Sequence, residues 1–348
     1  MNNFWDKLAR PFFVLAPLEG VTDAAFRRVI AEYSKYGGKV PFDESGKLVP
    51  HLRVSGGPHV MYTEFTSADG LVMAGKEGRD SLMSKLDYSE IERPIVAQLF
   101  SAVPERMEEA ARIVAGLGFD GIDINMGCPD RKVEKQGCGA AMMRDHKKAR
   151  EIIMAAHIGA PSLPVSVKTR IGYNEDELNT WLTALLEESV AAVAIHARTR
   201  KEMSKVPAHW DAIARAVSIR DSCQSGGSAK TLIIGNGDVR DLRDAREKAR
   251  KYGCDGVMLG RAIYGNPLLF SADWLRESSY GPRERIEILG RHLELFRELM
   301  EGGTSYAVMK KHFKSYISGM VGAKELRAKL MRTDTAYEAL RVLSTAHL

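Results

Sequence analysis

Eight short apolar segments, separated by longer segments with helical periodicity, are the feature of this sequence that most constrains its fold. They are Phe12–Ala16, Met61–Phe65, Ile95–Leu99, Gly121–Asn125, Val165–Lys168, Val193–His196, Leu232–Gly235 and Gly256–Leu259. Strands that alternate with helices are typical of a parallel sheet, and eight repeats are typical of a TIM barrel. A doubly wound sheet is the alternative, but the GxGxxG turn that it prefers after its first strand is absent. We therefore expect a TIM (β/α)8 barrel over residues 1–278.

Local signals predict where several helices begin and where the barrel is interrupted. Thr22-Asp23 before Ala24, Pro104 after Val103, and Asp238 before Val239 are typical helix starts. The segment 34–59 is rich in glycine, proline and charged residues, which indicates a surface insertion. A hairpin would fit this composition, and a loop without a function of its own is the simpler interpretation.

The C-terminal part of the sequence has a different pattern. From Gly281 onward the alternation stops and only helical periodicity remains, so we expect a second, all-helical domain over residues 279–348. Within Lys310–Arg332 seven bases face one acid, Glu325, and His312, Phe313 and Tyr316 lie among them. The bases are Lys310, Lys311, Lys314, Lys324, Arg327, Lys329 and Arg332. Such a run is often only a solvated helix face, but this excess beside aromatic residues favours contact with RNA phosphates.

Composition limits the other classes of protein. With 348 residues, 45% of them hydrophobic, the chain can bury one large core and still form a small second domain. No apolar run reaches the roughly 18 residues of a membrane span, and the N-terminus does not resemble a secretory signal. The four cysteines form no CxxC pair, so neither a zinc site nor a disulfide framework is predicted. We expect a cytoplasmic monomer with reduced thiols and no metal.

The segment Gly121–Met143 holds the best candidate for chemistry, Cys128. A buried strand ends at Asn125 and is followed directly by Gly127, Cys128 and Pro129. Barrel enzymes place catalytic side chains where a strand enters such a loop. Proline restricts the residue before it, so the thiol is held on a stiff piece of chain. A small buried cysteine would be the structural alternative, but the neighbouring small residues leave room for a flat ligand.

Polar residues at several other strand ends point to a cofactor. Gln98 lies in the third predicted strand, Lys168 ends the fifth and His196 ends the sixth. A lysine in a buried strand must meet an anion or an electron-rich group. Glycine-rich turns follow the last two strands, at 235–238 and at 260–261, and barrels bind phosphate at this place. Together these features indicate a phosphorylated cofactor with an aromatic ring, such as FMN.

Motifs along nearly the whole chain resemble those of the tRNA-dihydrouridine synthases. NMGCPDRKVEKQGCGAAMM around Cys128 resembles the active-site loop of this family. The other matching motifs occur in the same order, namely APLEGVTDAAFR, TEF, AQLF, VKTRIG, HARTR, NGD and LGRAIYGNP. The resemblance implies reduction of the C5–C6 double bond of specific tRNA uridines, with FMN as the hydride donor and NADPH or NADH as the reductant of the flavin.

The resemblance also implies roles for individual residues. Cys128 would give a proton to C5 of the uracil, and Asn125 and Arg170 would face the uracil. The implied FMN-binding residues are Pro17, Leu18 and Glu19 along the ring, Gln98 and Lys168 at its polar edge, His196, and Asn236, Gly237, Asp238, Gly260 and Arg261 at the phosphate end. A stacked uridine cannot reach a barrel mouth, so it must be turned out of the RNA. We expect Lys310, Lys311 and Lys314 to bind the tRNA around it.

Two other functions fit parts of this sequence. An FMN barrel that reduces a free small molecule, of the dihydroorotate or enoate type, would share the cofactor site but would not need the basic helical domain. An RNA-binding module without activity would share the helical domain but would have no use for the set of Cys128, Lys168, His196 and Arg261. Bound flavin in the purified protein would separate the second alternative from both enzymes.

Overall fold

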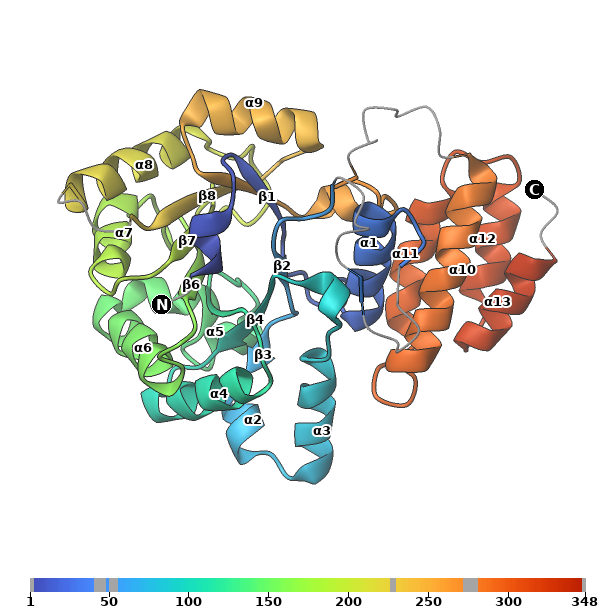
Figure 1. The fold of residues 1–348 in the computed structure, drawn as a ribbon, viewed down its shortest axis with the longest axis horizontal. Coiled ribbons are helices and arrows are strands. Elements are labelled where there is room, and N and C mark those ends of the chain that lie inside the picture. Colours follow the sequence, from blue (N-terminus) through green and yellow to red (C-terminus); the bar gives the residue numbers. More distant parts are fainter. Residues whose placement is uncertain (1–2, 41–47, 50–55, 226–229, 272–280, 346–348) are drawn as a thin grey trace. The chain divides into compact units, whose positions relative to one another are not determined.

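The predicted strands form one parallel sheet that closes into a barrel. The computed structural model describes residues 3–40, 48–49, 56–225, 230–271 and 281–345. Its strands are β1 (Phe12–Leu15), β2 (Met61–Tyr62), β3 (Thr66–Ser67), β4 (Ile95–Phe100), β5 (Gly121–Met126), β6 (Val165–Arg170), β7 (Ala192–His196), β8 (Leu232–Asn236) and β9 (Gly256–Leu259). Their order is β1-β9-β8-β7-β6-β5-β4-β2, with β3 beside β4 (Figure 1). A parallel bridge between Val14 and Val60 joins the two ends of this order, and the predicted TIM barrel is confirmed.

Helices follow most of the strands. They are α2 (Ala68–Met73), α3 (Lys76–Lys85), α4 (Pro104–Gly116), α5 (Arg131–Glu134), α6 (His146–Gly159), α7 (Leu178–Leu186), α8 (Asp211–Cys223) and α9 (Leu242–Tyr252). Short 3-10 helices span Phe4–Lys7, Glu90–Glu92, Gly139–Arg144 and Arg261–Ile263. Residues of β4 and β5 are buried along their whole length, as expected for strands enclosed by side chains on both faces.

Helix starts agree with two of the three sequence predictions. The Asp23 carboxylate accepts a hydrogen bond from the Phe26 N–H at 2.9 Å, so Asp23 caps the first long helix. Helix α4 begins at Pro104, as predicted. The prediction at Asp238 is wrong, because α9 begins at Leu242 and its capping side chain is Asp241. Asp238 instead has a left-handed backbone, with φ of 46°, in the turn before the helix.

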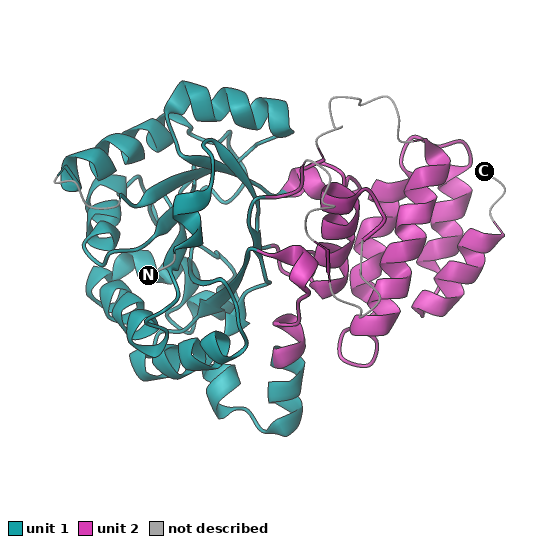
Figure 2. Cartoon of the chain, in the orientation of Figure 1, with its two compact units in different colours: residues 1–17, 59–82, 94–260 teal, residues 18–58, 83–93, 261–348 magenta. Residues whose placement is uncertain are grey.

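The chain divides into two compact units (Figure 2). The first comprises Met1–Pro17, His59–Leu82 and Pro94–Gly260, and it contains all the barrel strands. The second comprises Leu18–Pro58, Met83–Arg93 and Arg261–Leu348. Its long helices are α1 (Ala24–Tyr36), α10 (Pro282–Leu299), α11 (Ala307–Ile317), α12 (Ala323–Met331) and α13 (Ala336–Ser344). The C-terminal region is therefore helical, as predicted, and α1 belongs to the same unit.

The second unit has its own core. Phe26 of α1 stacks on His292 of α10 at a centroid distance of 5.0 Å and contacts His312 of α11 at 4.7 Å. Beside this cluster the Arg27 guanidinium donates to the Glu92 carboxylate at 2.8 Å, and both side chains are fully buried. The predicted boundary between residues 278 and 279 lies outside the described residues. Of the predicted insertion at 34–59, the first three residues are the last turn of α1, and 41–47 and 50–55 lie outside the described residues.

Candidate active site

The C-terminal halves of β4, β5 and β6 bring several of the predicted polar side chains together. Strand register places Gln98 opposite Asp123, and Asn125 two residues later lies opposite Lys168. Residues two apart on a strand face the same side of the sheet, so these side chains occupy two successive levels on one face. Gln98, Asp123 and Asn125 are buried and Lys168 is half-buried. Gln98 and Lys168 from the predicted set of strand-end residues therefore lie on one face, with Asn125 on the strand between them.

The loop that carries Cys128 is held by hydrogen bonds from both sides. The Asn125 Oδ1 accepts from the Gly127 N–H at 3.2 Å and from the Cys128 N–H at 2.9 Å. On the other side the Cys128 carbonyl accepts from the Ala140 N–H at 2.9 Å. Gly139 has φ of 61°, and a Cβ added there would lie 2.6 Å from the Cys128 carbonyl oxygen. Only glycine permits this close approach, which explains part of the glycine cluster seen in the sequence.

Burial keeps the Cys128 thiol protonated. The side chain is half-buried against Phe100, Val133 and Cys138. Burial raises the pKa of Cys128 above its ordinary value, and the positive charges of Lys168 and Arg170 oppose this only in part. A thiol in this state can donate a proton at neutral pH. Cys138 is almost fully buried, and burial raises its pKa to about 12, which is the behaviour of a structural thiol.

Lys168 is a cation without a partner in this part of the barrel. Within the described residues no hydrogen bond or ion pair reaches its ammonium group. Burial and the nearby Arg170 lower the pKa of Lys168 to about 8, although Asp123 and Cys128 act in the opposite direction. Holding a desolvated ammonium group without a partner costs free energy. The side chain is therefore suited to meet an anionic or electron-rich group of a ligand.

Arg170 binds the backbone of two loops. Its Nε donates to the Gly127 carbonyl at 2.8 Å. Its Nη1 donates to the Thr199 carbonyl at 3.2 Å and to the Met203 carbonyl at 3.1 Å. The guanidinium thus connects the Cys128 loop to the loop after β7. The sequence predicted that Arg170 faces the uracil, and that role stays a prediction beside the clamping role seen here.

A polar cluster surrounds His196 at the end of β7. The Nη1 of Arg198 donates to the Nε2 of His196 at 3.0 Å, which leaves the ring proton of neutral His196 on Nδ1. Arg198 also donates to the Val206 carbonyl at 2.6 Å and forms an ion pair with Asp238. Asp238 therefore neutralises Arg198, and its predicted place at a phosphate stays a prediction.

The ends of β8 and β9 carry the glycine-rich turns. Gly237 has φ of 124°, and a Cβ there would lie 2.9 Å from the Ala208 Cβ and 3.1 Å from the His196 Cδ2. The Asn236 amide donates to the Met258 carbonyl at 2.9 Å and so ties the two strand ends together. Gly260 follows β9 directly and is half-buried. Ala208 and His196 therefore fill the space that a side chain at Gly237 would need, so glycine is required there by packing within the protein.

The remaining predicted cofactor residues lie at the end of β1 or in the second unit. Pro17 is half-buried just after β1. The Leu18 N–H donates to the Thr22 hydroxyl at 2.8 Å. The Glu19 carboxylate pairs with Lys85 at 2.6 Å, and both side chains are partly exposed. Arg261 is exposed at the first residue of a 3-10 helix that follows Gly260. Their predicted contacts with FMN stay predictions.

The basic segment of the second unit divides into an exposed and a buried face. Lys311 and Lys314 are exposed on α11 and Lys310 is half-buried, 3.6 Å from the exposed Asp334. The Lys311 ammonium donates to the Gly20 carbonyl at 3.4 Å. His312, Phe313 and Tyr316 were expected beside the RNA phosphates, but all three are fully buried. Helical periodicity turns them into the core of the unit, so the exposed face of α11 offers bases without these aromatic rings.

Two residues that sequence reasoning did not assign contribute to the site. Asp123 lies in the middle of β5, where an acid inside a buried strand was visible but was given no role. Arg198 lies in the HARTR motif and organises His196 and Asp238. The feature of the sequence that could have identified Arg198 is a basic residue two positions after the histidine that ends a strand. The chain alone does not show which of several neighbouring bases turns inward.

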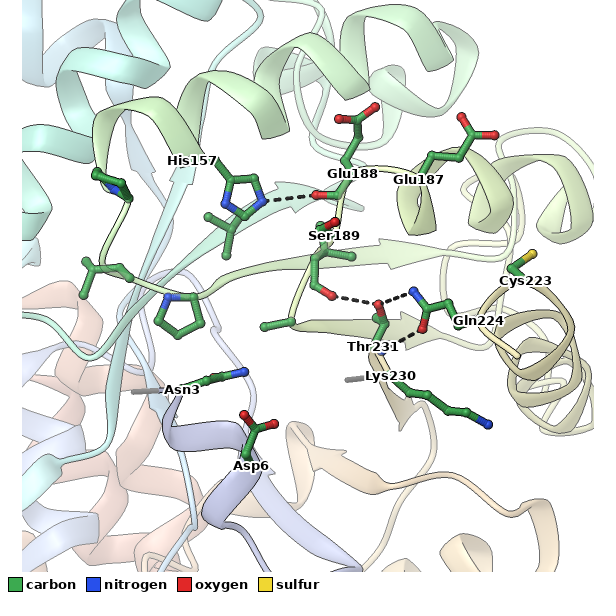
Figure 3. Close-up of a pocket in the computed structure, with 16 residues that line it drawn as sticks. Asn3, Asp6, His157, Glu187, Glu188, Ser189, Cys223, Gln224, Lys230 and Thr231 are labelled. Carbon is green, nitrogen blue, oxygen red and sulfur yellow. Dashed lines mark hydrogen bonds between the residues drawn. The ribbon is translucent and has the colours of Figure 1, made fainter. Parts of the chain in front are cut away.

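A concave region lies at the end of the barrel opposite to Cys128. A cavity of about 940 Å³ is lined by residues at the N-terminal ends of β6, β7 and β8, including Val165, Ala191 and Thr231 (Figure 3). His157 and Gln224 in its wall are bound to the Glu188 carbonyl and to Thr231. Residues 226–229, next to this wall in sequence, lie outside the described part of the chain. Barrel enzymes place catalysis at the other end, where Cys128 lies.

The described residues contain no candidate metal site and no candidate membrane span. No group of three or more histidine, cysteine, aspartate or glutamate side chains among them is arranged to hold a metal ion. None of the described helices combines the length and the apolar composition needed to cross a bilayer.

Comparison with known proteins identifies the family. The family model described as Dihydrouridine synthase (Dus) matches residues 14–348. A probable tRNA-dihydrouridine synthase of Staphylococcus aureus (strain COL) is 40% identical over 344 residues, which is 98% of this chain and 95% of that protein. Probable tRNA-dihydrouridine synthase 2 of Bacillus subtilis (strain 168) is 39% identical, with 98% and 96% of the two chains covered. The chain belongs to the dihydrouridine synthase family.

Proposed function

We propose that this protein reduces the C5–C6 double bond of specific uridines in tRNA to 5,6-dihydrouridine. Its family membership supports the reaction. The structural observation that carries the proposal is that two suitable side chains lie at the ends of two neighbouring strands of the barrel. One strand end leads to a half-buried thiol with a raised pKa, and the next presents an ammonium group that no described residue binds. A reduction of this kind needs a proton donor and a bound redox cofactor, and the two side chains are suited to these tasks.

The residues of the barrel fit FMN as the cofactor. Lys168 and Gln98 would bind the polar edge of the ring, because a partly desolvated ammonium group and a buried amide match electron-rich ring atoms. Asn236, Gly237, Asp238, Gly260 and the adjoining Arg261 would hold the phosphate, because turns with small residues after the last barrel strands offer backbone N–H groups to an anion. His196 and Pro17 would contact the cofactor, and Leu18 and Glu19 would line its ring. When bound, FMN supplies the hydride to C6, after reduction by NADPH or NADH.

Cys128 would deliver the proton to C5. Its backbone is fixed by Asn125 and by Ala140, so the thiol keeps one position while the substrate binds. Asn125 and Arg170 would meet the uracil edge, and Arg170 would also hold the loop closed through the Gly127 carbonyl. A uridine within folded RNA has to leave its stack to reach this site.

The tRNA would be held mainly by the exposed bases of the helical unit. Lys310, Lys311 and Lys314 lie within two turns of α11, and Lys324, Arg327 and Lys329 are exposed on α12. Contact with phosphates releases counterions, so such bases bind RNA without reading its sequence. Choice of the uridine then depends on the shape of the tRNA and on the barrel site.

A comparison of Cys128→Ala with Cys138→Ala tests the proposed reaction. Cys128→Ala should keep FMN and should still be reduced by NADPH, because neither step uses the thiol. Reoxidation of the reduced flavin by tRNA should slow by about 10²–10⁴-fold, which is the typical loss of general acid catalysis. Cys138 is the matched control, because it is a buried thiol of the same loop with no proposed role.

Stopped-flow absorbance of the flavin separates the two half-reactions. Equal reoxidation rates for wild type and Cys128→Ala would refute the assignment of the acid. A larger loss in Cys138→Ala would move the acid to that thiol. Purified protein that binds FAD, or that binds no flavin after reconstitution, would contradict the proposed cofactor.

A further inference from the structure

Asp123 is a fully buried acid in the centre of the barrel sheet. It lies in β5, and strand register places it between Gln98 of β4 and Ser166 of β6. Burial of a carboxylate is costly unless hydrogen bonds and charges compensate for the lost water. The reaction proposed above assigns Asp123 no step, so its retention in the centre of the sheet needs another explanation.

Both oxygens of Asp123 are bound by neighbouring strands. The Gln98 Nε2 donates to Oδ2 at 2.7 Å, and the Ser166 hydroxyl donates to Oδ1 at 2.6 Å. An ionised carboxylate has no hydrogen to donate. The side-chain amide of Gln98 must therefore turn its NH₂ group toward Asp123 and its oxygen away.

The opposite end of Gln98 leads to the Cys128 loop. Its Oε1 accepts from the Asn125 Nδ2 at 3.3 Å. The Asn125 Oδ1 then accepts from the backbone N–H groups of Gly127 and Cys128. Two side chains, Gln98 and Asn125, thus connect the buried carboxylate to the backbone of the proposed proton donor, and each of them donates an N–H toward Asp123.

Chemistry at both ends of this series fixes its direction. A backbone N–H can only donate, which requires an oxygen of Asn125 at the loop. An ionised carboxylate can only accept, which requires a nitrogen of Gln98 at Asp123. If Gln98 turned by 180°, two oxygens would face each other at Asp123 and two NH₂ groups would face each other at Asn125. Asp123 therefore selects the orientation of Gln98, which matches the orientation that the loop N–H groups require of Asn125.

We propose that Asp123 is a positioning residue, which acts through Gln98 and Asn125 to hold the backbone of Cys128 in its working place. The inference rests on the proposed function only for what Cys128 does, and not for how it is held. The side chain of Asp123 touches neither substrate nor cofactor in this proposal. Its carboxylate supplies the acceptor that begins the series.

The charge of Asp123 suggests a competing role. Asp123 also acts on the pKa of Lys168, so its loss could change the site through that ammonium group instead of through Gln98. Asp123→Asn separates the two roles. The asparagine oxygen can still accept from Gln98 and its NH₂ group can donate to the Ser166 hydroxyl, so the series survives while the charge is lost.

The experiment measures alkylation of Cys128 by iodoacetamide at fixed pH, site by site, in the protein as purified. Cys223 is exposed on α8 and serves as the internal reference within each sample. Asp123→Leu removes the acceptor at similar volume, and Asp123→Ala does so without adding bulk if the leucine variant does not fold. Loss of the anchoring bonds should raise the relative rate at Cys128 by about fivefold or more, whereas Asp123→Asn should stay within about twofold of wild type.

Two further variants check the route. Ser166→Ala removes the other hydrogen bond to Asp123 and should leave the Cys128 rate within about twofold of wild type. In a Gln98→Leu background, Asp123→Ala should add less than about twofold, because the series is already broken. An unchanged rate in Asp123→Ala, an equal rise in Asp123→Asn, or an equal rise in Ser166→Ala would each overturn the proposal. No tRNA or NADPH is used, so the result stands apart from the fate of the proposed reaction.

Discussion

Replacement of Gly139 by alanine should slow proton donation without removing any functional group. Gly139 and Gly137 have almost the same left-handed backbone, with φ of 61° and 75°. They differ in what a side chain would meet. A Cβ at Gly139 would lie 2.6 Å from the Cys128 carbonyl oxygen and 2.9 Å from the Val133 Cγ1, whereas at Gly137 it would lie 3.4 Å from the Ala102 Cβ.

The structure gives the size of each effect. Alanine in a left-handed conformation costs about 1–2 kcal/mol of folding free energy at either position. At Gly137 that is the main cost, because 3.4 Å is an ordinary contact. At Gly139 the Cys128 carbonyl must also withdraw by about half an ångström, since the packed loop has no free volume to absorb the methyl group. A displacement of 1 Å in an active site costs about a hundredfold in rate, so half of it should cost about tenfold.

Flavin reoxidation by tRNA and thermal unfolding together decide the outcome. Both variants should unfold at a lower temperature than wild type, but only Gly139→Ala should reoxidise about ten times more slowly. Reduction by NADPH should be similar in all three proteins. Equal reoxidation rates in the two variants would refute the argument that the position of the Cys128 backbone limits proton transfer.

Three further perturbations test separate parts of the site. Lys168→Met should weaken FMN binding by about ten- to a hundredfold in a fluorescence titration. The flavin-free variant should unfold at the wild-type temperature or above it, because no described residue binds the ammonium group and its burial costs free energy. Joint replacement of Lys310, Lys311 and Lys314 by alanine should reduce the slope of the logarithm of the tRNA-binding constant against the logarithm of salt concentration by about two to three. Flavin reduction should not change. An unaltered slope would mean that these lysines form only a solvated helix face. Burial raises the pKa of Cys128, so the tRNA-dependent rate should stay constant at neutral pH and fall only as alkaline pH removes the proton; a fall already below pH 8 would contradict this.

The strands of the barrel could be predicted because a strand buried on both faces leaves a strong signal in the chain. β4 and β5 are continuous buried runs, and their ends agree with the prediction to within one residue. Strand register then determines which residues are neighbours, so the meeting of Gln98 and Lys168 followed from their positions at strand ends. The same signal gives no information about which polar atoms bind each other.

Side chains outside the barrel strands were harder to predict, because their partners are far away in sequence. Asp238 was expected to begin a helix, but it lies before the helix and pairs with Arg198, 40 residues earlier. Tyr316 and its aromatic neighbours on α11 were expected beside RNA, but they fill the core of the helical unit. In both cases several local roles were compatible with the residue type, and tertiary contacts selected among them.

Burial at Cys128 outweighs the influences that lower its pKa, a hydrogen bond from the Asp130 backbone first among them, so this thiol suits proton donation and not nucleophilic attack. Lys168 and Arg170 place positive charge near the sulfur, and such charge usually favours the thiolate. Burial is the larger influence on the pKa of Cys128. Arg170 also uses its N–H groups to bind the carbonyls of Gly127, Thr199 and Met203. Lys168, with a pKa of about 8, carries its charge incompletely in mildly alkaline solution. A ligand anion at Lys168 would weaken its pull on the sulfur further, so occupation of the cofactor site should make Cys128 a more fully protonated acid.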